Sequence, residues 1–136
     1  LDVACGYNEF KGRINHIIGI DPYNDNADLQ VGTLDYKTDH KFDVILCLGS
    51  VNFGSRDKII AEVERCEKLL ADGGIMFFRV NPGLPHDKPE ADWIEFYAWN
   101  VPFIIELSEK FNLKILDIRD DTNSRKYFVY KKVAKP

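Results

Sequence analysis

Two short segments near the start of the chain carry residues suited to binding a nucleoside. The first is a strand-like run over 1–5 that meets a tight turn at Gly6, and the second is a run over 17–20 that ends on Asp21. A glycine turn lets the backbone approach a ligand closely, and a carboxylate at the end of a neighbouring strand can accept hydrogen bonds from both ribose hydroxyls. The spacing therefore predicts a nucleoside-binding α/β site built around Gly6 and Asp21.

The elements that must position these two residues alternate between strands and connections. We expect strands over 1–4, 16–20, 29–31, 42–48, 75–80, 113–118 and 126–133. The apolar run over 42–48 is typical of a central parallel strand that is buried on both faces. Because only a few residues separate the last two strands, they must form an antiparallel hairpin. The pattern predicts an α/β fold, a Rossmann-like three-layer sandwich whose mostly parallel, seven-stranded sheet ends in an antiparallel strand.

Two stretches after the central strand show helical patterns. Ser55 can cap a helix in which apolar residues recur with helical spacing, and the acid and two glycines at 72–74 end it. Asn100, two residues before a proline, predicts the start of a second helix, because proline suits the first turn. Between the two we expect a proline-rich loop over 81–89 and an aromatic helix over 90–99 that packs mainly in the core.

Length and composition suit a single domain over 1–136 with one core. The net charge of −4 argues against a sequence-wide basic surface for nucleic acid. There is no apolar run long enough to span a bilayer and no signal peptide. Cys5, Cys47 and Cys66 lack metal-ligand spacing, so we expect no metal site, and reduced, buried thiols in a cytoplasmic protein. Because the chain begins inside a strand and not with methionine, we expect a preceding N-terminal segment that could carry substrate contacts.

Five short motifs occur along the chain in the order and with the gaps of one known family. They are Leu1-Asp2-Val3-Ala4-Cys5-Gly6, Gly19-Ile20-Asp21, Thr33-Leu34-Asp35, Phe42-Asp43-Val44-Ile45-Leu46-Cys47 and Leu69-Leu70-Ala71-Asp72-Gly73-Gly74-Ile75. Together they resemble the motifs of a class I S-adenosylmethionine-dependent methyltransferase, and the match covers nearly the whole chain. The form of the first two is similar to a compact subset of these proteins that is common in phages and bacteria.

The turn at Gly6 departs from the family pattern, which usually carries more than one glycine. Here Ala4 and Asn8 flank Gly6. Asparagine tolerates left-handed backbone, so we expect Asn8 to replace a glycine at that point. The connection from Gly6 to Asp21 is short and is interrupted by Gly12, which predicts that the family's usual helix is reduced to a turn or two.

The resemblance implies S-adenosylmethionine as the cofactor and gives each group of residues a role. Asp21 would bind the ribose, Asp35 with Leu34 would contact the adenine, and Asp2 would hold loop amides or, through water, the ammonium group. For Asp2 and Asp35 an ordinary structural or surface role remains open. The residues implied in cofactor binding are Asp2, Ala4, Gly6, Asp21, Pro22, Leu34, Asp35, Leu48, Gly49 and Ser50.

Methyl transfer from a sulfonium is a direct displacement, so an obligatory catalytic side chain is not expected. His86 and Asn52 are candidates for a base at the pocket mouth, although a lone loop histidine is more often simply solvated. The methyl acceptor is unassigned, and an oligomer is compatible with the sequence. The alternative is a methyltransferase-like structural or regulatory module without activity, for example one associated with a virion. The single glycine and the final hairpin argue against a nicotinamide-dependent oxidoreductase.

Overall fold

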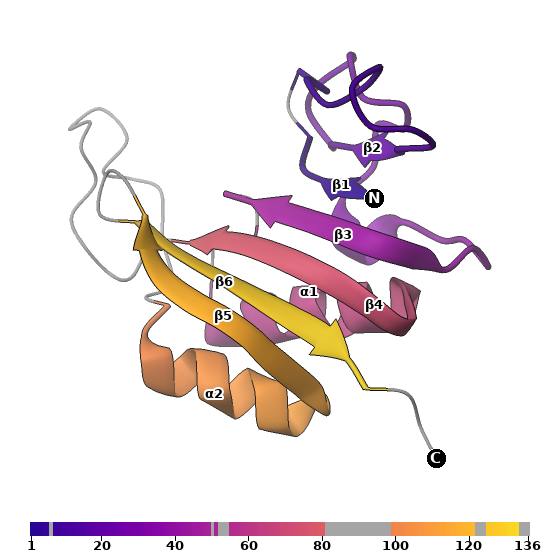
Figure 1. Ribbon diagram of the computed structural model, residues 1–136. Helices are drawn as coiled ribbons and strands as arrows, with labels where there is room; N and C mark the ends of the chain where they lie inside the picture. The colour runs from indigo at the N-terminus through magenta and orange to yellow at the C-terminus, as the bar shows by residue number, and fades with distance from the viewer. Residues whose placement is uncertain (6, 50, 52–54, 81–98, 122–124, 134–136) are drawn as a thin grey trace, which may run out of the picture.

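The computed structural model describes residues 1–5, 7–49, 51, 55–80, 99–121 and 125–133 (Figure 1). Within them, six strands form one sheet: β1 (Asp2–Val3), β2 (Gly19–Ile20), β3 (Phe42–Leu48), β4 (Leu70–Val80), β5 (Leu113–Asp121) and β6 (Arg125–Lys132). Their order is β2-β1-β3-β4-β6-β5. The first four strands pair in parallel, and β6 runs antiparallel to both of its neighbours. This arrangement confirms the predicted Rossmann-like α/β fold class.

Two α-helices, each started by the residue that the sequence predicts, lie in the described part of the chain. Helix α1 (Arg56–Leu69) begins after Ser55, whose hydroxyl accepts a hydrogen bond from the backbone N–H of Lys58 at 3.3 Å. Helix α2 (Val101–Lys110) begins after Asn100, whose side chain accepts from the N–H of Phe103 at 2.9 Å. Neither helix is long and apolar enough to cross a membrane.

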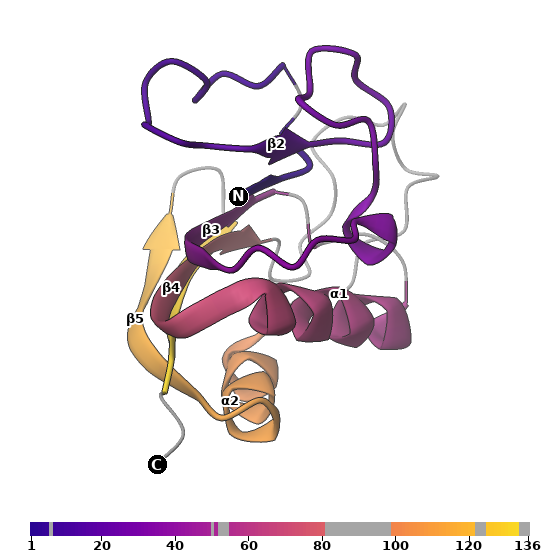
Figure 2. The same cartoon turned by 90° about the vertical axis from the view of Figure 1, so that its right-hand side faces the viewer.

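The core lies between these helices and one face of the sheet (Figure 2). Alternate residues of β3, β4 and β6 point into it and are fully buried: Ile45, Cys47, Met76, Phe78, Phe128 and Tyr130. Trp99 joins them, and its indole N–H donates to the carbonyl oxygen of Val51 at 2.7 Å. The phenol of Tyr130 donates to the carbonyl oxygen of Ile104 at 2.7 Å. Both polar atoms of these large side chains are therefore satisfied inside the core.

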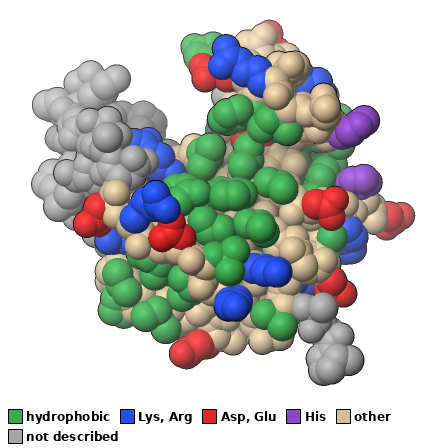
Figure 3. Space-filling view, in the orientation of Figure 1, with side chains coloured by type: hydrophobic (Ala, Val, Ile, Leu, Met, Phe, Trp, Pro, Cys, Tyr) green, Lys and Arg blue, Asp and Glu red, His purple; other side chains and the backbone are tan. Residues whose placement is uncertain are grey.

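The opposite face of the sheet is apolar, and no helix among the described residues covers it. The strand register places Leu46, Phe77 and Val129 in one row across β3, β4 and β6. Val44 and Leu48 flank this row and are 44% and 40% exposed. Hydrophobic side chains gather over this face in Figure 3. Sheets of parallel strands are normally covered on both sides, so the third layer predicted from the sequence needs chain outside the described residues. The expectation that a segment precedes Leu1 stays a prediction.

Two details differ from the sequence prediction. The described residues form six strands and not seven, because the expected strand over 29–31 makes only one bridge, between Ile20 and Leu29. The donors that the next step of this parallel ladder would use are taken elsewhere, since the N–H of Tyr23 donates to Oδ1 of Asp21 at 2.8 Å and the N–H of Val31 donates to the carbonyl oxygen of Leu29 at 3.1 Å. Strand β4 starts at Leu70 and includes Gly73, whose φ is 79°. The predicted loop over 81–89 lies outside the described residues.

The aromatic helix predicted over 90–99 also lies outside the described residues, except for Trp99. The expected loss of the helix after the first strand is observed, since residues 7–16 form turns.

Candidate functional site

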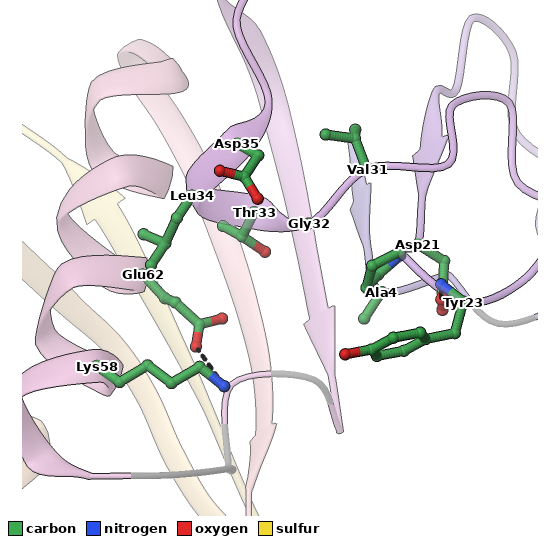
Figure 4. A pocket seen from close by; sticks show the side chains of 11 residues that line it. Ala4, Asp21, Tyr23, Val31, Gly32, Thr33, Leu34, Asp35, Lys58 and Glu62 are labelled. Carbon is green, nitrogen blue, oxygen red and sulfur yellow. Dashed lines mark hydrogen bonds and ion pairs between the residues drawn. The ribbon is translucent and has the colours of Figure 1, made fainter.

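A pocket of about 460 Å³ opens where β1 and β2 end (Figure 4). In the sheet order, β1 lies between β2 and β3. The strand that follows β1 in sequence is added on one side of it, and the next strand is added on the other side. Open α/β sheets bind ligands at this place, outside the carboxyl ends of the strands. The lining residues are Ala4, Asp21, Pro22, Tyr23, Val31, Gly32, Thr33, Leu34, Asp35, Lys58 and Glu62.

Asp21 comes directly after β2 and forms one wall of the pocket. Its Oδ1 accepts a hydrogen bond from the backbone N–H of Tyr23 at 2.8 Å, an Asx turn that fixes the direction of the chain. The N–H of Asp21 donates to the carbonyl oxygen of Leu29 at 3.3 Å. The carboxylate is half-buried, and each of its oxygens has two lone pairs with which to accept hydrogen bonds.

The turn after β1 brings backbone to the same wall. Ala4 lines the pocket with a φ of 53°, a left-handed conformation that non-glycine residues rarely adopt. Asn8 has a φ of 59°, which confirms the expectation that it takes a glycine-like conformation. Its side-chain amide donates to the carbonyl oxygen of Asn26 at 3.1 Å and so ties the turn to the loop after β2. Strained backbone of this kind tends to occur at functional sites.

A short 3-10 helix, η1 (Thr33–Asp35), forms the next wall. Thr33 is buried, whereas Leu34 is 47% exposed and Asp35 is exposed beside it. An apolar side chain held open next to a carboxylate suits a planar ring that carries a hydrogen-bond donor. This is the segment that the sequence assigned to the adenine.

The remaining wall is the first part of α1, and sequence reasoning did not find it. Glu62 is only 8% exposed, and its Oε1 lies 3.9 Å from the ammonium nitrogen of Lys58. Burial raises the pKa of Glu62, and the charge of Lys58 opposes that rise. A signal was present, because Glu62 falls between Ile59 and Cys66 on the apolar stripe of the helix. An acid at such a position is either paired or functional.

Asp2 lies in β1 and is 5% exposed, but it is not among the residues that line the pocket. Burial raises its pKa to about 6. Leu48 ends β3 and Gly49 follows it, and neither residue lines the pocket. Gly49 has a φ of 89° and donates from its N–H to the carbonyl oxygen of Arg79 at 3.0 Å. The predicted site residues Gly6, Ser50, Asn52 and His86 lie outside the described residues.

The pocket therefore brings together five of the predicted cofactor-binding residues. These are Ala4, Asp21, Pro22, Leu34 and Asp35. They come from the ends of β1 and β2 and from η1, which are separate segments in the sequence. Among the described residues, no group of three His, Cys, Asp or Glu side chains could hold a metal ion.

Fold and pocket together define a Rossmann-like α/β domain with a pocket at the carboxyl ends of β1 and β2. Solved methyltransferases share this fold. A 1,6-didemethyltoxoflavin-N1-methyltransferase from Burkholderia thailandensis, solved with its substrate and S-adenosylhomocysteine, matches with a TM-score of 0.77 and 14% identity over 98% of this chain and 70% of its own. A methyltransferase from Clostridium acetobutylicum matches with a TM-score of 0.71 and 15% identity over 98% and 83%.

The N-methyltransferase NodS from Bradyrhizobium japonicum matches with a TM-score of 0.70 and 14% identity over 98% of this chain and 84% of its own. No family model matches the sequence, and no curated protein is similar to it. At these identities the likeness establishes the fold. The chain has the fold of the class I S-adenosylmethionine-dependent methyltransferases, as the order of its motifs predicts.

Proposed function

We propose that the protein is an S-adenosylmethionine-dependent methyltransferase that transfers a methyl group by direct displacement. One observation carries this proposal. In the fold of these enzymes, the pocket at the ends of β1 and β2 gathers Ala4, Asp21 and the η1 segment around one cavity. The sequence resemblance assigns Asp21 to the ribose and Leu34 with Asp35 to the adenine, and it counts Ala4 among the cofactor-binding residues.

The residues present fit such a cofactor. The cavity of about 460 Å³ lies within the usual range for small-molecule sites. Three carboxylates line it, from Asp21, Asp35 and Glu62. Ionised carboxylates only accept hydrogen bonds, so this lining suits a ligand that offers donors and positive charge. S-adenosylmethionine offers ribose hydroxyls, an exocyclic amino group, an ammonium and a sulfonium.

The chain's own residues would bind and orient the reactants. Asp21 would accept hydrogen bonds from the ribose, and Leu34 would pack against the purine. The strained turn at Ala4 would bring backbone to the methionine end, with the buried charge of Asp2 behind it. When bound, the cofactor supplies a methyl group on a positively charged sulfur, which an acceptor nucleophile displaces to leave S-adenosylhomocysteine. Alignment of the two reactants and exclusion of water account for the acceleration, so no catalytic base is assigned.

A cytoplasmic location is part of this proposal. Cys5, Cys47 and Cys66 are free thiols, and the last two are buried in the core. Buried thiols that form no disulfide, such as those of Cys47 and Cys66, are usual in reducing compartments.

Calorimetry with S-adenosylhomocysteine tests the proposal. We expect the folded protein to bind it in the micromolar range, and Asp21→Ala to weaken binding at least about a hundredfold, because two hydrogen bonds to a charged group are lost. Asp25→Ala is a matched control, since Asp25 is exposed in the same loop and lies outside the pocket lining. Unchanged affinity in Asp21→Ala would remove the assigned site. No binding by the folded wild type would refute the function and favour the module without activity.

A further inference from the structure

Glu62 is a buried carboxylate that faces the pocket without a hydrogen-bond donor from the described residues. Its side chain is 10% exposed, and what remains accessible opens to the cavity (Figure 4). Among the described residues its ionic partner is Lys58, one helical turn earlier, at 3.9 Å. That separation is an ion pair beyond hydrogen-bond distance, and the Lys58 side chain is itself 51% exposed.

A carboxylate in this position is unfavourable unless something donates to it. Removing an ionised group from water costs free energy that only hydrogen bonds or a close opposite charge can offset. The charge of Lys58 offsets part of this cost. The pKa of Glu62 is still raised, so part of the desolvation cost of its ionised form remains. A hydrogen bond from a bound ligand to Glu62 would therefore contribute more binding free energy than the same hydrogen bond to a carboxylate that is exposed to water.

The position of Glu62 selects which part of the proposed cofactor it can meet. Leu34 and Glu62 lie on neighbouring walls of the pocket, because η1 packs against α1. Asp21 and Ala4 lie on the opposite wall. A nucleoside whose ribose is held by Asp21 would direct its base toward Leu34 and Glu62. The exocyclic amino group is the donor on that edge of adenine.

We propose that Glu62 is a specificity-determining residue that accepts a hydrogen bond from the exocyclic amino group of the cofactor's adenine. It thereby selects a 6-amino purine over a 6-oxo purine, which presents an acceptor at the same place. The proposal rests on the function proposed above. Asp35 lies at the same end of the pocket, and the two hydrogens of the amino group allow both carboxylates to contribute. The carboxylate of Glu62 is the more discriminating of the two because it is buried, whereas Asp35 is exposed.

A binding ratio tests this assignment without relying on enzymatic activity. Calorimetry measures the dissociation constants of S-adenosylhomocysteine and its 6-oxo analogue, S-inosylhomocysteine, for the wild type and Glu62→Gln. We expect the wild type to prefer the amino compound and the preference to fall about tenfold or more in Glu62→Gln, because an amide can also donate to the 6-oxo group. A purely structural role of Glu62 would change both constants together and leave their ratio alone.

Glu64→Gln is the matched control, because Glu64 is half-exposed on the same helix, pairs with Lys68 at 3.2 Å and lies outside the pocket. Its ratio should equal that of the wild type. An unchanged ratio in Glu62→Gln, with S-adenosylhomocysteine still bound, would overturn the assignment and leave the proposed function standing. The assignment would also be overturned if Asp35→Asn lost the preference for S-adenosylhomocysteine over S-inosylhomocysteine and Glu62→Gln kept it. Failure of the folded wild type to bind S-adenosylhomocysteine would overturn the proposed function and this assignment with it.

Discussion

Replacing Asp2 with asparagine is expected to stabilise the folded chain at neutral pH. Asp2 is 5% exposed, and no hydrogen bond from a described residue reaches its carboxylate. Burial raises the pKa of Asp2 from 3.8 to about 6. The ionised form is thus less favourable in the folded state than in the unfolded chain, where water surrounds the carboxylate.

The two pKa values set the size of the effect and its pH range. At about 1.4 kcal/mol for each pH unit between them, 3.8 and about 6 correspond to about 3 kcal/mol at neutral pH. Between these values the folded state binds more protons than the unfolded chain, so the wild type loses stability as the pH rises from about 4 to about 6. Asp2→Asn has no such loss. The buried amide has its own desolvation cost, which makes about 3 kcal/mol the upper bound.

Urea unfolding followed by tryptophan fluorescence, repeated at several pH values from about 4 to about 8, measures this difference. Trp99 is a suitable reporter because it is fully buried in the core. Asp43→Asn is the control, since Asp43 is exposed on β3 and folding does not remove its side chain from water, so this substitution should leave the free energy of unfolding nearly unchanged. If Asp2→Asn is less stable than the wild type by the same amount at every pH, donors stabilise the carboxylate and the desolvation argument is wrong.

Two further substitutions test the packing that positions the site. Tyr130→Phe removes the hydrogen bond from the phenol to the Ile104 carbonyl oxygen and should lower the free energy of unfolding by about 1 kcal/mol in urea titrations; Tyr127→Phe, on the open face of the sheet, should change it by less than half as much. Gly19→Ala would place a Cβ 2.3 Å from Oδ1 of Asn8 and should cost about 1–3 kcal/mol, measured by thermal unfolding. Gly32→Ala is its control, because the nearest atom to that Cβ is 4.0 Å away, and equal losses in both variants would contradict the steric reasoning.

The parts of the fold that the sequence predicted are those that local chemistry decides. Ser55 and Asn100 each cap a helix with their own side chain, so the starts of α1 and α2 depend on neighbouring residues only. The apolar run over 42–48 forms β3 because alternate residues on one face are fully buried. Asn8 takes its left-handed conformation for a reason that belongs to asparagine itself.

The differences arise where a distant part of the chain decides. The run over 29–31 has strand-forming residues, but the N–H of Tyr23 donates to Oδ1 of Asp21 at 2.8 Å and the N–H of Val31 donates to the carbonyl oxygen of Leu29 at 3.1 Å, so the edge ladder stays one bridge long. The α1 wall of the pocket could not be placed from the sequence, since only the packing of α1 against η1 brings Glu62 beside Leu34. A helical pattern indicates that an acid lies on a buried stripe, and the tertiary structure determines which cavity it faces.

The buried acids themselves are an argument for a ligand. Among the described carboxyl groups, those with a pKa raised by burial are Asp2 in β1 and Glu62 in α1. Neither receives a hydrogen bond from a described residue, and each lowers the stability of the folded protein at neutral pH. A core optimised for stability alone would place apolar side chains there. Glu62 lines the pocket and Asp2 does not. Perturbed groups in a pocket are typical of functional sites, and a ligand that donates a hydrogen bond to Glu62 would offset the desolvation of its carboxylate.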